Sequence, residues 1–190
     1  MEEPDDLALI RSVARKDREA FEALYYRYAP RLGRYAFKLL RRREAVDEVI
    51  NDVMLVVWQG AARFEDRGSS LSAWLFGITH NKVMKMLDRT KRRDREVPPE
   101  TEAAPLTEGE NPPQDPEHAA IGHQLGAQVA GALSKLSAEH RAVIELAIGE
   151  GQSYEEIAQV MGCPVGTVKT RMFNARKRLA SLLAEESRAS

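Results

Sequence analysis

The sequence predicts an all-α protein in which two small helical domains are joined by a flexible acidic linker. Length is the first observation, because 190 residues suffice for two small domains. Composition is the second: Leu, Ala, Glu, Arg and Lys dominate, while long alternating runs of Val, Ile and Thr are absent. The third is the stretch 94–118, which holds six of the nine prolines and eight acidic residues. Such a stretch cannot bury enough apolar surface to offset the entropy of ordering it.

This acidic stretch sets the expected domain boundaries. We predict a first helical domain at residues 1–93, a linker at 94–117 and a second helical domain at 118–190. The linker is interpreted as a plain spacer, with contact between its acids and the flanking basic patches as the alternative. Those patches stand out in a chain of net charge −1: residues 82–95 hold seven bases against two acids, and residues 163–184 hold five bases and no acid.

Within the first domain, apolar residues at helical spacing predict five helices. The first four are expected around Leu7–Ala14 and at Arg18–Tyr28, Arg31–Arg42 and Glu44–Trp58. Asp17 should cap the second of these helices, and Pro30 should end it. Gly and Ser residues then indicate a loop at 62–70, after which Ser70 caps a fifth helix that runs to about Arg89.

The second domain is predicted to end in a helix-turn-helix. Its first helix is marked by Ile121, Leu125, Val129, Ala132, Leu133 and Leu136, and Ser137 caps the next one, which ends at Gly149 and Gly151. Ser153 and Glu156 then have the spacing of a capping box, in which each side chain bonds the backbone of the other residue. Gly162-Cys163-Pro164 is a tight break that places Pro164 in the first turn of a new helix. Two short helices joined by such a turn are typical of the motif.

The helix after this turn has two chemically different faces. At about 100° per residue, the apolar face comprises Val165, Val168, Met172, Ala175 and Leu179. The opposite face carries side chains suited to base edges and phosphates, namely Thr167, Thr170, Asn174, Lys177 and Arg178, with Lys169, Phe173 and Arg176 at its shoulder. Phe173 indicates contact with thymine methyls or a partner, and packing on a neighbouring helix is the alternative. A solvated basic face is the alternative for the whole helix.

The same sequence argues against several classes of protein. It has no run of 18 apolar residues for a membrane span, and its acidic N-terminus is unlike a secretion signal. Cys163 is the single cysteine, and His118 and His123, five residues apart, do not share a helix face as a metal pair would. No phosphate loop, nucleophile elbow or paired-carboxylate motif is found. We therefore expect a cytoplasmic protein that is not an enzyme and needs no cofactor or metal.

Four segments together resemble the extracytoplasmic-function sigma factors. "FEALYYRYAPRLGRYAFKLL", "DEVINDVMLVVWQGAARF" and "SLSAWLFGITHNKVMKMLDRTKRR" are similar to the N-terminal domain of that family, in the expected order. "QSYEEIAQVMGCPVGTVKTRMFNARKRL" is similar to its DNA-binding domain. The resemblance implies a dissociable subunit of bacterial RNA polymerase, with a region 2 helical bundle that melts the −10 element and a region 4 helix-turn-helix that reads the −35 element. It implies core polymerase and promoter DNA as partners, with an anti-sigma factor as a further candidate.

The resemblance assigns the −35 contacts to the last helix. Its candidates are Thr167, Lys169, Thr170, Arg171, Phe173, Asn174, Lys177 and Arg178. Lys169, Thr170 and Phe173 match family positions that touch the element, and Arg171 and Lys177 are expected at phosphates. Asn174 departs from the family, in which Arg is frequent, and Asn favours adenine where Arg favours guanine.

Two further sets follow from the resemblance in the first domain. The −10 candidates are Phe64, Arg67, Ser70, Trp74, Asn81, Lys82, Lys85 and Arg89, and the loop from Phe64 to Ser70 would hold an extruded base. The spacing of Trp74 with Leu71, Leu75 and Ile78 favours burial of Trp74 over stacking. Asp47, Glu48, Asn51 and Asp52 would dock on core polymerase, with a solvated acidic face as the alternative.

Two other functions compete with a promoter-specificity factor. A stand-alone helix-turn-helix regulator would bind duplex DNA through the second domain only, usually as a dimer. A helical interaction protein would bind no DNA. The sigma-factor interpretation alone explains the basic helix and the acidic surface of the first domain.

Overall fold

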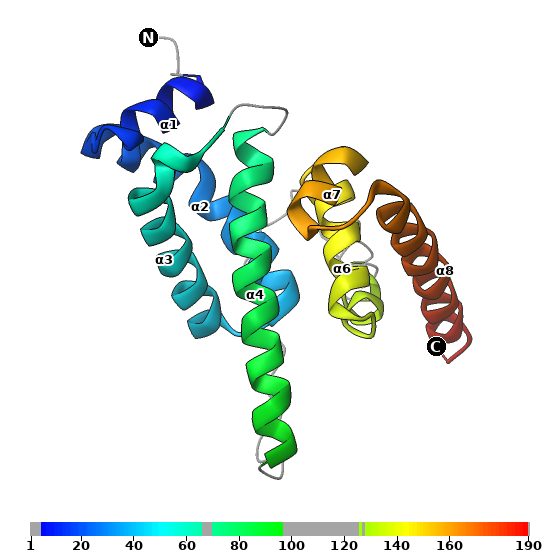
Figure 1. The fold of residues 1–190 in the computed structure, drawn as a ribbon. Helices are drawn as coiled ribbons and strands as arrows, with labels where there is room; N and C mark the ends of the chain where they lie inside the picture. Colours follow the sequence, from blue (N-terminus) through cyan, green and yellow to red (C-terminus); the bar gives the residue numbers. More distant parts are fainter. Residues whose placement is uncertain (1–4, 66–69, 97–125, 127, 190) are drawn as a thin grey trace, which may run out of the picture.

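The computed structural model describes residues 5–65, 70–96, 126 and 128–189 of the chain. All regular structure in these ranges is helical, which confirms the predicted fold class (Figure 1). The first part contains α1 (Asp6–Ala14), α2 (Arg18–Leu40), α3 (Arg43–Gly60), the short turn η1 (Ala61–Arg63) and α4 (Leu71–Glu96). The second contains helical residues 128–134, α6 (Ala138–Ile144), the π-helical turn η2 (Glu145–Gly149), α7 (Tyr154–Met161) and α8 (Val165–Ala189). No helix in these ranges combines the length and apolar content needed to cross a membrane.

The first four helices share one core. Tyr28, Tyr35, Leu32, Val53 and Phe76, from α2, α3 and α4, are almost completely buried together. The rings of Tyr35 and Phe76 meet edge to face with centroids 5.5 Å apart. Because side chains of this size bury the largest apolar area, they fix how the three long helices cross.

Helix α2 corrects one prediction, because Pro30 lies inside the helix and does not end it. Leu24 and Tyr28 before the proline and Leu32 and Tyr35 after it are buried in the same core. Burial on both sides of Pro30 offsets the lost backbone hydrogen bond, so the two expected helices are one. Helix α2 ends where Arg41 adopts the left-handed conformation, with φ of 54°.

The predicted caps are confirmed. Asp17 accepts from the amides of Glu19 and Ala20, and Ser137 accepts from the amide of His140. Ser153 and Glu156 form the expected capping box at the start of α7. Ser70 accepts from the amide of Ala73 at 3.1 Å. Helix α4 continues to Glu96, beyond the predicted end near Arg89. The expected linker beyond Glu96 and the marks Ile121 and Leu125 lie outside the described residues.

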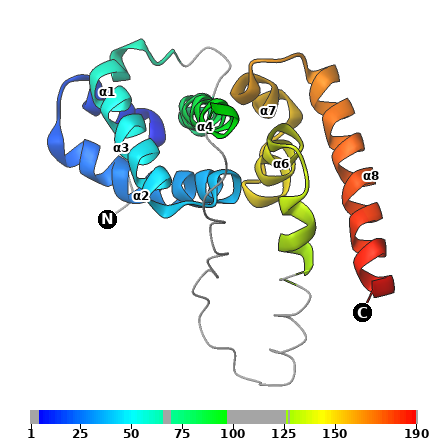
Figure 2. The same cartoon turned by 90° about the horizontal axis from the view of Figure 1, so that it is seen from below.

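The two groups of helices are in direct contact, which the sequence did not predict. Helix α4 lies between α2 and α3 on one side and α7 on the other, while α8 lies at the far edge (Figure 2). A Cβ atom added at Gly77 of α4 would lie 3.8 Å from the Cα of Val160 in α7. This is ordinary contact distance, so the position admits only a small residue between the backbones of the two helices.

His80 gives the folded chain a pH dependence. It is buried on α4, with its Nδ1 2.8 Å from the hydroxyl of Tyr35. Its pKa is lowered from 6.5 to about 4, mainly by burial and in part by nearby Arg171, while Glu139 opposes the shift. Between these two pH values the unfolded chain binds more protons than the folded chain. The stability that neutral His80 confers is therefore complete above pH 6.5 and is lost as the pH falls toward 4.

We expect the free energy of unfolding to fall by about 3 kcal/mol through His80 over this window. Chemical denaturation at pH 7, 5 and 4 should show a smaller acid loss for His80→Gln than for the unmodified chain. His140→Gln, on α6, is the matched control and should retain the full loss. Equal acid losses in all three proteins would contradict the role given to His80.

The capping box predicts a defined cost for one substitution. Ser153→Ala removes the acceptor for the amide of Glu156 and should lower the free energy of unfolding by about 1 kcal/mol. Ser181→Ala is the control, because the Ser181 hydroxyl is exposed and bonds only the carbonyl of Lys177 within α8. Denaturant titration measures both, and equal stability of the two variants would contradict the assignment.

Candidate nucleic-acid interface

Helix α8 is held by its apolar face, as the sequence predicts. Val168, Met172 and Ala175 are buried against α6 and α7. Gly162 adopts the left-handed conformation with φ of 60°, so α7 stops and the chain turns within three residues into α8. The motif therefore presents α8 as a rigid element with its second face outward.

The outward face of α8 brings together most of the predicted −35 residues. Lys169, Thr170, Phe173, Asn174, Lys177 and Arg178 are exposed, and Thr167 is half-buried. Phe173 has 67% of its surface exposed, which excludes packing on a neighbouring helix among the described residues. The hydroxyl of Thr170 donates to the carbonyl of Gly166 at 3.0 Å and keeps its lone pairs free to accept.

Arg171 is placed differently from the rest of this set. Its guanidinium is half-buried, with Nη2 4.0 Å from Oε1 of Glu139 on α6 and Nη1 3.8 Å from Sγ of Cys163. The side chain thus turns toward α6 and the turn before α8 in its own domain. Its expected phosphate contact stays a prediction.

The predicted −10 residues divide into an exposed row and an aromatic pair. Asn81, Lys85 and Arg89 are exposed at successive turns of α4. The rings of Phe64 and Trp74 meet edge to face with centroids 5.5 Å apart, and both are half-buried. This contact agrees with the interpretation of Trp74 as a packing residue. Arg67 lies outside the described residues.

A hollow that the sequence did not indicate adjoins Phe64. Its volume is about 370 Å³, and it is lined by Arg11 and Arg15 of α1, Phe64 and the apolar residues Leu7, Ile10, Ala14, Ala61 and Ala62. Two exposed guanidinium groups beside an aromatic ring are suited to a phosphate and a base. No sequence signal marked it, because its two walls lie about 50 residues apart in the chain.

The predicted docking residues form one exposed acidic face on α3, comprising Asp47, Glu48, Asn51 and Asp52. Sequence reasoning missed that Leu55 and Val56 continue this face one turn further, with Leu55 53% exposed. Their position four residues after Asn51 and Asp52 is the signal that would have found them. Asp52 also accepts from Nζ of Lys82 at 2.6 Å, which joins the acidic face of α3 to the basic face of α4.

Nothing in the described ranges points to metal chemistry, since no group of three His, Cys, Asp or Glu side chains there could hold an ion.

The shifted pKa of Glu156 has a structural cause. Hydrogen bonds from the backbone of Ser153 and the hydroxyl of Ser70 lower it by stabilising the carboxylate.

Comparison with known proteins gives the same two parts in the same order. The family model for sigma-70 region 2 matches residues 24–93, and the model for sigma-70 region 4 matches residues 127–179. The chain is 32% identical over 179 residues to the ECF RNA polymerase sigma factor SigL of Mycobacterium tuberculosis, which covers 94% of this chain and 97% of the relative. It is 32% identical over 178 residues to the sigma factor RpoE of Cereibacter sphaeroides, with 92% and 93% covered.

Two solved structures have a similar fold. One is the sigma factor RpoE of Bartonella quintana in complex with the anti-sigma factor NepR, with a TM-score of 0.69, 28% identity and coverage of 86% of this chain and 96% of that chain. The other is CnrH in complex with the cytosolic domain of CnrY, with a TM-score of 0.66, 29% identity and coverage of 93% and 96%. With both regions matched in order and near-full-length relatives above 30% identity, the chain belongs to the extracytoplasmic-function group of RNA polymerase sigma factors.

Proposed function

We propose that this sigma factor docks on core RNA polymerase through α3, reads the −35 duplex with α8 and opens the −10 element with α4. The observation that carries the proposal is the outward face of α8, where an exposed aromatic ring is surrounded by Lys, Arg, Thr and Asn. On a helix face whose other side chains suit base edges and phosphates, an exposed ring is available for contact with a thymine methyl. The functional domains are residues 1–93 and 118–190, separated by residues 94–117.

The chemistry of α8 suits the major groove of duplex DNA. Phe173 provides apolar contact for a thymine methyl, and Asn174 can pair with both the N6 and N7 atoms of adenine. Lys169, Lys177 and Arg178 supply positive charge for phosphates on either side of the groove. The helix therefore combines base reading with positioning.

The exposed row on α4 suits single-stranded DNA. Asn81, Lys85 and Arg89 follow one another at about one turn of helix, so they can track a strand backbone. Opening the duplex costs stacking energy, which capture of an extruded base near Phe64 would offset. The hollow beside Phe64, with its two arginines, supports that place for the base.

The face of α3 suits a basic surface of the polymerase. Asp47, Glu48 and Asp52 supply charge that speeds association and fixes register. Leu55 and Val56 supply the adjoining apolar area, and burying this area in the contact would slow dissociation.

Membership of the family supports proposals about catalysis, compartment and regulation. We propose that the protein is not an enzyme and acts in the cytoplasm, where the polymerase acts on DNA. An anti-sigma factor is proposed as an inhibitory partner, because the similar sigma factor of Bartonella quintana was solved with such a protein bound.

Run-off transcription with purified core polymerase tests this function. Adding the protein should produce specific starts from a promoter library, and Phe173→Ala should reduce them about tenfold by removing the apolar contact. Arg188→Ala, near the exposed end of α8, is the control and should behave as the unmodified protein. Absence of any specific start with core polymerase would contradict the sigma-factor role, and full activity of Phe173→Ala would contradict the role of that ring.

Asn174 predicts a change of base preference. Asn174→Arg should favour guanine over adenine at the contacted position by roughly 1–3 kcal/mol, because Arg pairs with both O6 and N7 of guanine. A binding selection with holoenzyme on a randomised −35 element measures the profile. Lys177→Arg, which keeps the charge at a proposed phosphate contact, should leave the profile unchanged, and an unchanged profile for Asn174→Arg would rule out base reading there.

A further inference from the structure

The contact between the two domains covers part of the surface proposed to open the −10 element. Helix α7 makes its most extensive contact with α4. No residue from Leu71 to His80 of α4 is exposed, whereas Asn81, Lys85 and Arg89 beyond the contact are exposed. Gly77 lies under α7 and is three residues after Trp74 and four before Asn81, so α7 sits over the same side of α4 as the proposed row.

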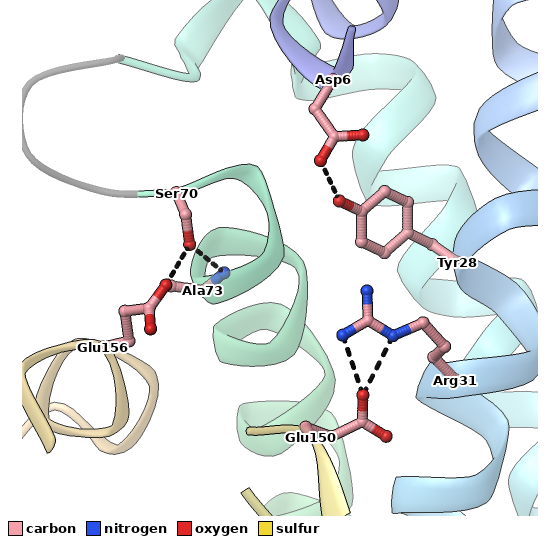
Figure 3. A network of polar contacts seen from close by, with 7 residues as sticks. All are labelled: Asp6, Tyr28, Arg31, Ser70, Ala73, Glu150 and Glu156. Carbon is pink, nitrogen blue, oxygen red and sulfur yellow. Dashed lines mark hydrogen bonds and ion pairs between the residues drawn. The ribbon is translucent and has the colours of Figure 1, made fainter. Parts of the chain in front are cut away.

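An ion pair joins the domains beside this contact, between α2 and the end of η2 (Figure 3). Nε and Nη2 of Arg31, on α2, each lie 3.0 Å from Oε2 of Glu150, which follows η2. The Glu150 side chain is only 9% exposed and the Arg31 side chain 34%, so the carboxylate end of the pair is shielded from water. The Arg31 guanidinium also lies over the rings of Tyr28 and Phe76, at 5.5 and 5.7 Å from their centroids. Arg31 is thus held in place by its own domain and offers a fixed site for Glu150.

A second polar contact joins the beginning of α4 to α7 (Figure 3). The hydroxyl of Ser70 donates to Oε1 of Glu156 at 2.7 Å while it caps the amide of Ala73. The carboxylate of Glu156 thereby lies at the N-terminus of α4, where the helix dipole favours negative charge. Ser70 is a proposed −10 residue, so this contact occupies part of the DNA-binding surface.

The closed arrangement cannot serve both promoter elements together. Elements centred about 25 base pairs apart are separated by roughly 85 Å of duplex at 3.4 Å per pair. Helix α7 contacts both α4 and α8, and packed helix axes lie about 8–10 Å apart, so the two proposed reading helices are only roughly 20 Å apart across α7. The 29 residues at 97–125 can extend to at most about 100 Å, so the length of the chain permits the separation that promoter binding requires.

We infer that the free sigma factor inhibits itself through this closed arrangement, and that the Arg31–Glu150 pair is the latch that sets how readily the domains separate for core polymerase and promoter. The inference rests on the proposed function. The latch is separable from the binding surfaces, because neither residue belongs to the proposed DNA or docking sets. By contrast, Ser70 and Glu156 also cap helices, and Arg141, which donates to the carbonyls of Lys38 and Leu39 in α2, also donates to Leu133, Ser134 and Leu136 in its own domain.

Charge reversal and charge exchange test the latch in the full chain. Donor and acceptor dyes are placed on cysteines introduced at Glu22 and Ser181, both exposed and in different domains, in a Cys163→Ser background. Arg31→Glu and Glu150→Arg should each lower energy transfer in the free protein. Each should also tighten binding of the free protein to a single-stranded −10 oligonucleotide about fivefold, because the surface of α4 that α7 covers becomes accessible in the open state. The double exchange Arg31→Glu/Glu150→Arg should restore both values toward those of the unmodified protein.

A pair of substitutions at Gly77 tests the contact without changing charge. Gly77→Ala adds a Cβ at ordinary contact distance from Val160 and should keep high energy transfer, whereas Gly77→Leu should force α7 away and lower it. Circular dichroism and thermal melting check that every variant retains its helices.

Three results would overturn the inference. The first is unchanged energy transfer in folded Arg31→Glu, Glu150→Arg and Gly77→Leu. The second is opening of the charge-reversal variants without any gain in affinity for the −10 oligonucleotide. The third is a double exchange that behaves as the sum of the single reversals. Failure of the unmodified protein to bind core polymerase would instead contradict the proposed function, while the energy-transfer comparison would still report on the latch.

Discussion

Helix α4 must pack against other helices on opposite sides at once, and the rest of the structure depends on this constraint. Toward α2 it buries Leu75 and Phe76, and His80 bonds Tyr35. Toward α7 it presents Gly77, where a Cβ would just reach contact distance of the Val160 backbone and a larger side chain would not fit. Only beyond His80 does α4 expose a polar row. Different parts of α4 thus contribute to the core of the first domain, pack against α7 of the second domain and present a candidate DNA-binding row.

Electrostatics in this protein is local, although the total charge is close to zero. The acidic face of α3, the basic row of α4 and the outward face of α8 carry charges of different sign on separate helices. Interactions between exposed charges are screened within about 10 Å at ordinary ionic strength, so each face acts on its own partner. The Lys82–Asp52 pair is the point where the first two faces touch.

Buried Arg141 at the domain contact is satisfied by backbone carbonyls. Arg141 is buried, and burial lowers its pKa, yet its guanidinium donates to carbonyls at the end of α2 and in the second domain. Carbonyl groups in the last turn of a helix lack partners within the helix and carry partial negative charge. A planar guanidinium can therefore donate to carbonyls at two helix ends at once. An ion pair with a single carboxylate would join it to one residue only.

The sequence by itself determined the helical class, the caps and the two faces of α8, because helix periodicity and capping depend on residues close together in the chain. The same local signals found the exposed residues of α3 and α4. Only the tertiary structure decided that Pro30 continues α2, since that depends on apolar partners from other helices on both sides of the proline. It also decided the orientation of the Arg171 side chain toward α6, the hollow beside Phe64 and the packing of α7 against α4. These features join residues from about 30 to 120 positions apart, as Arg31 and Glu150 do, and the free energy of such contacts arises only when the fold brings them together.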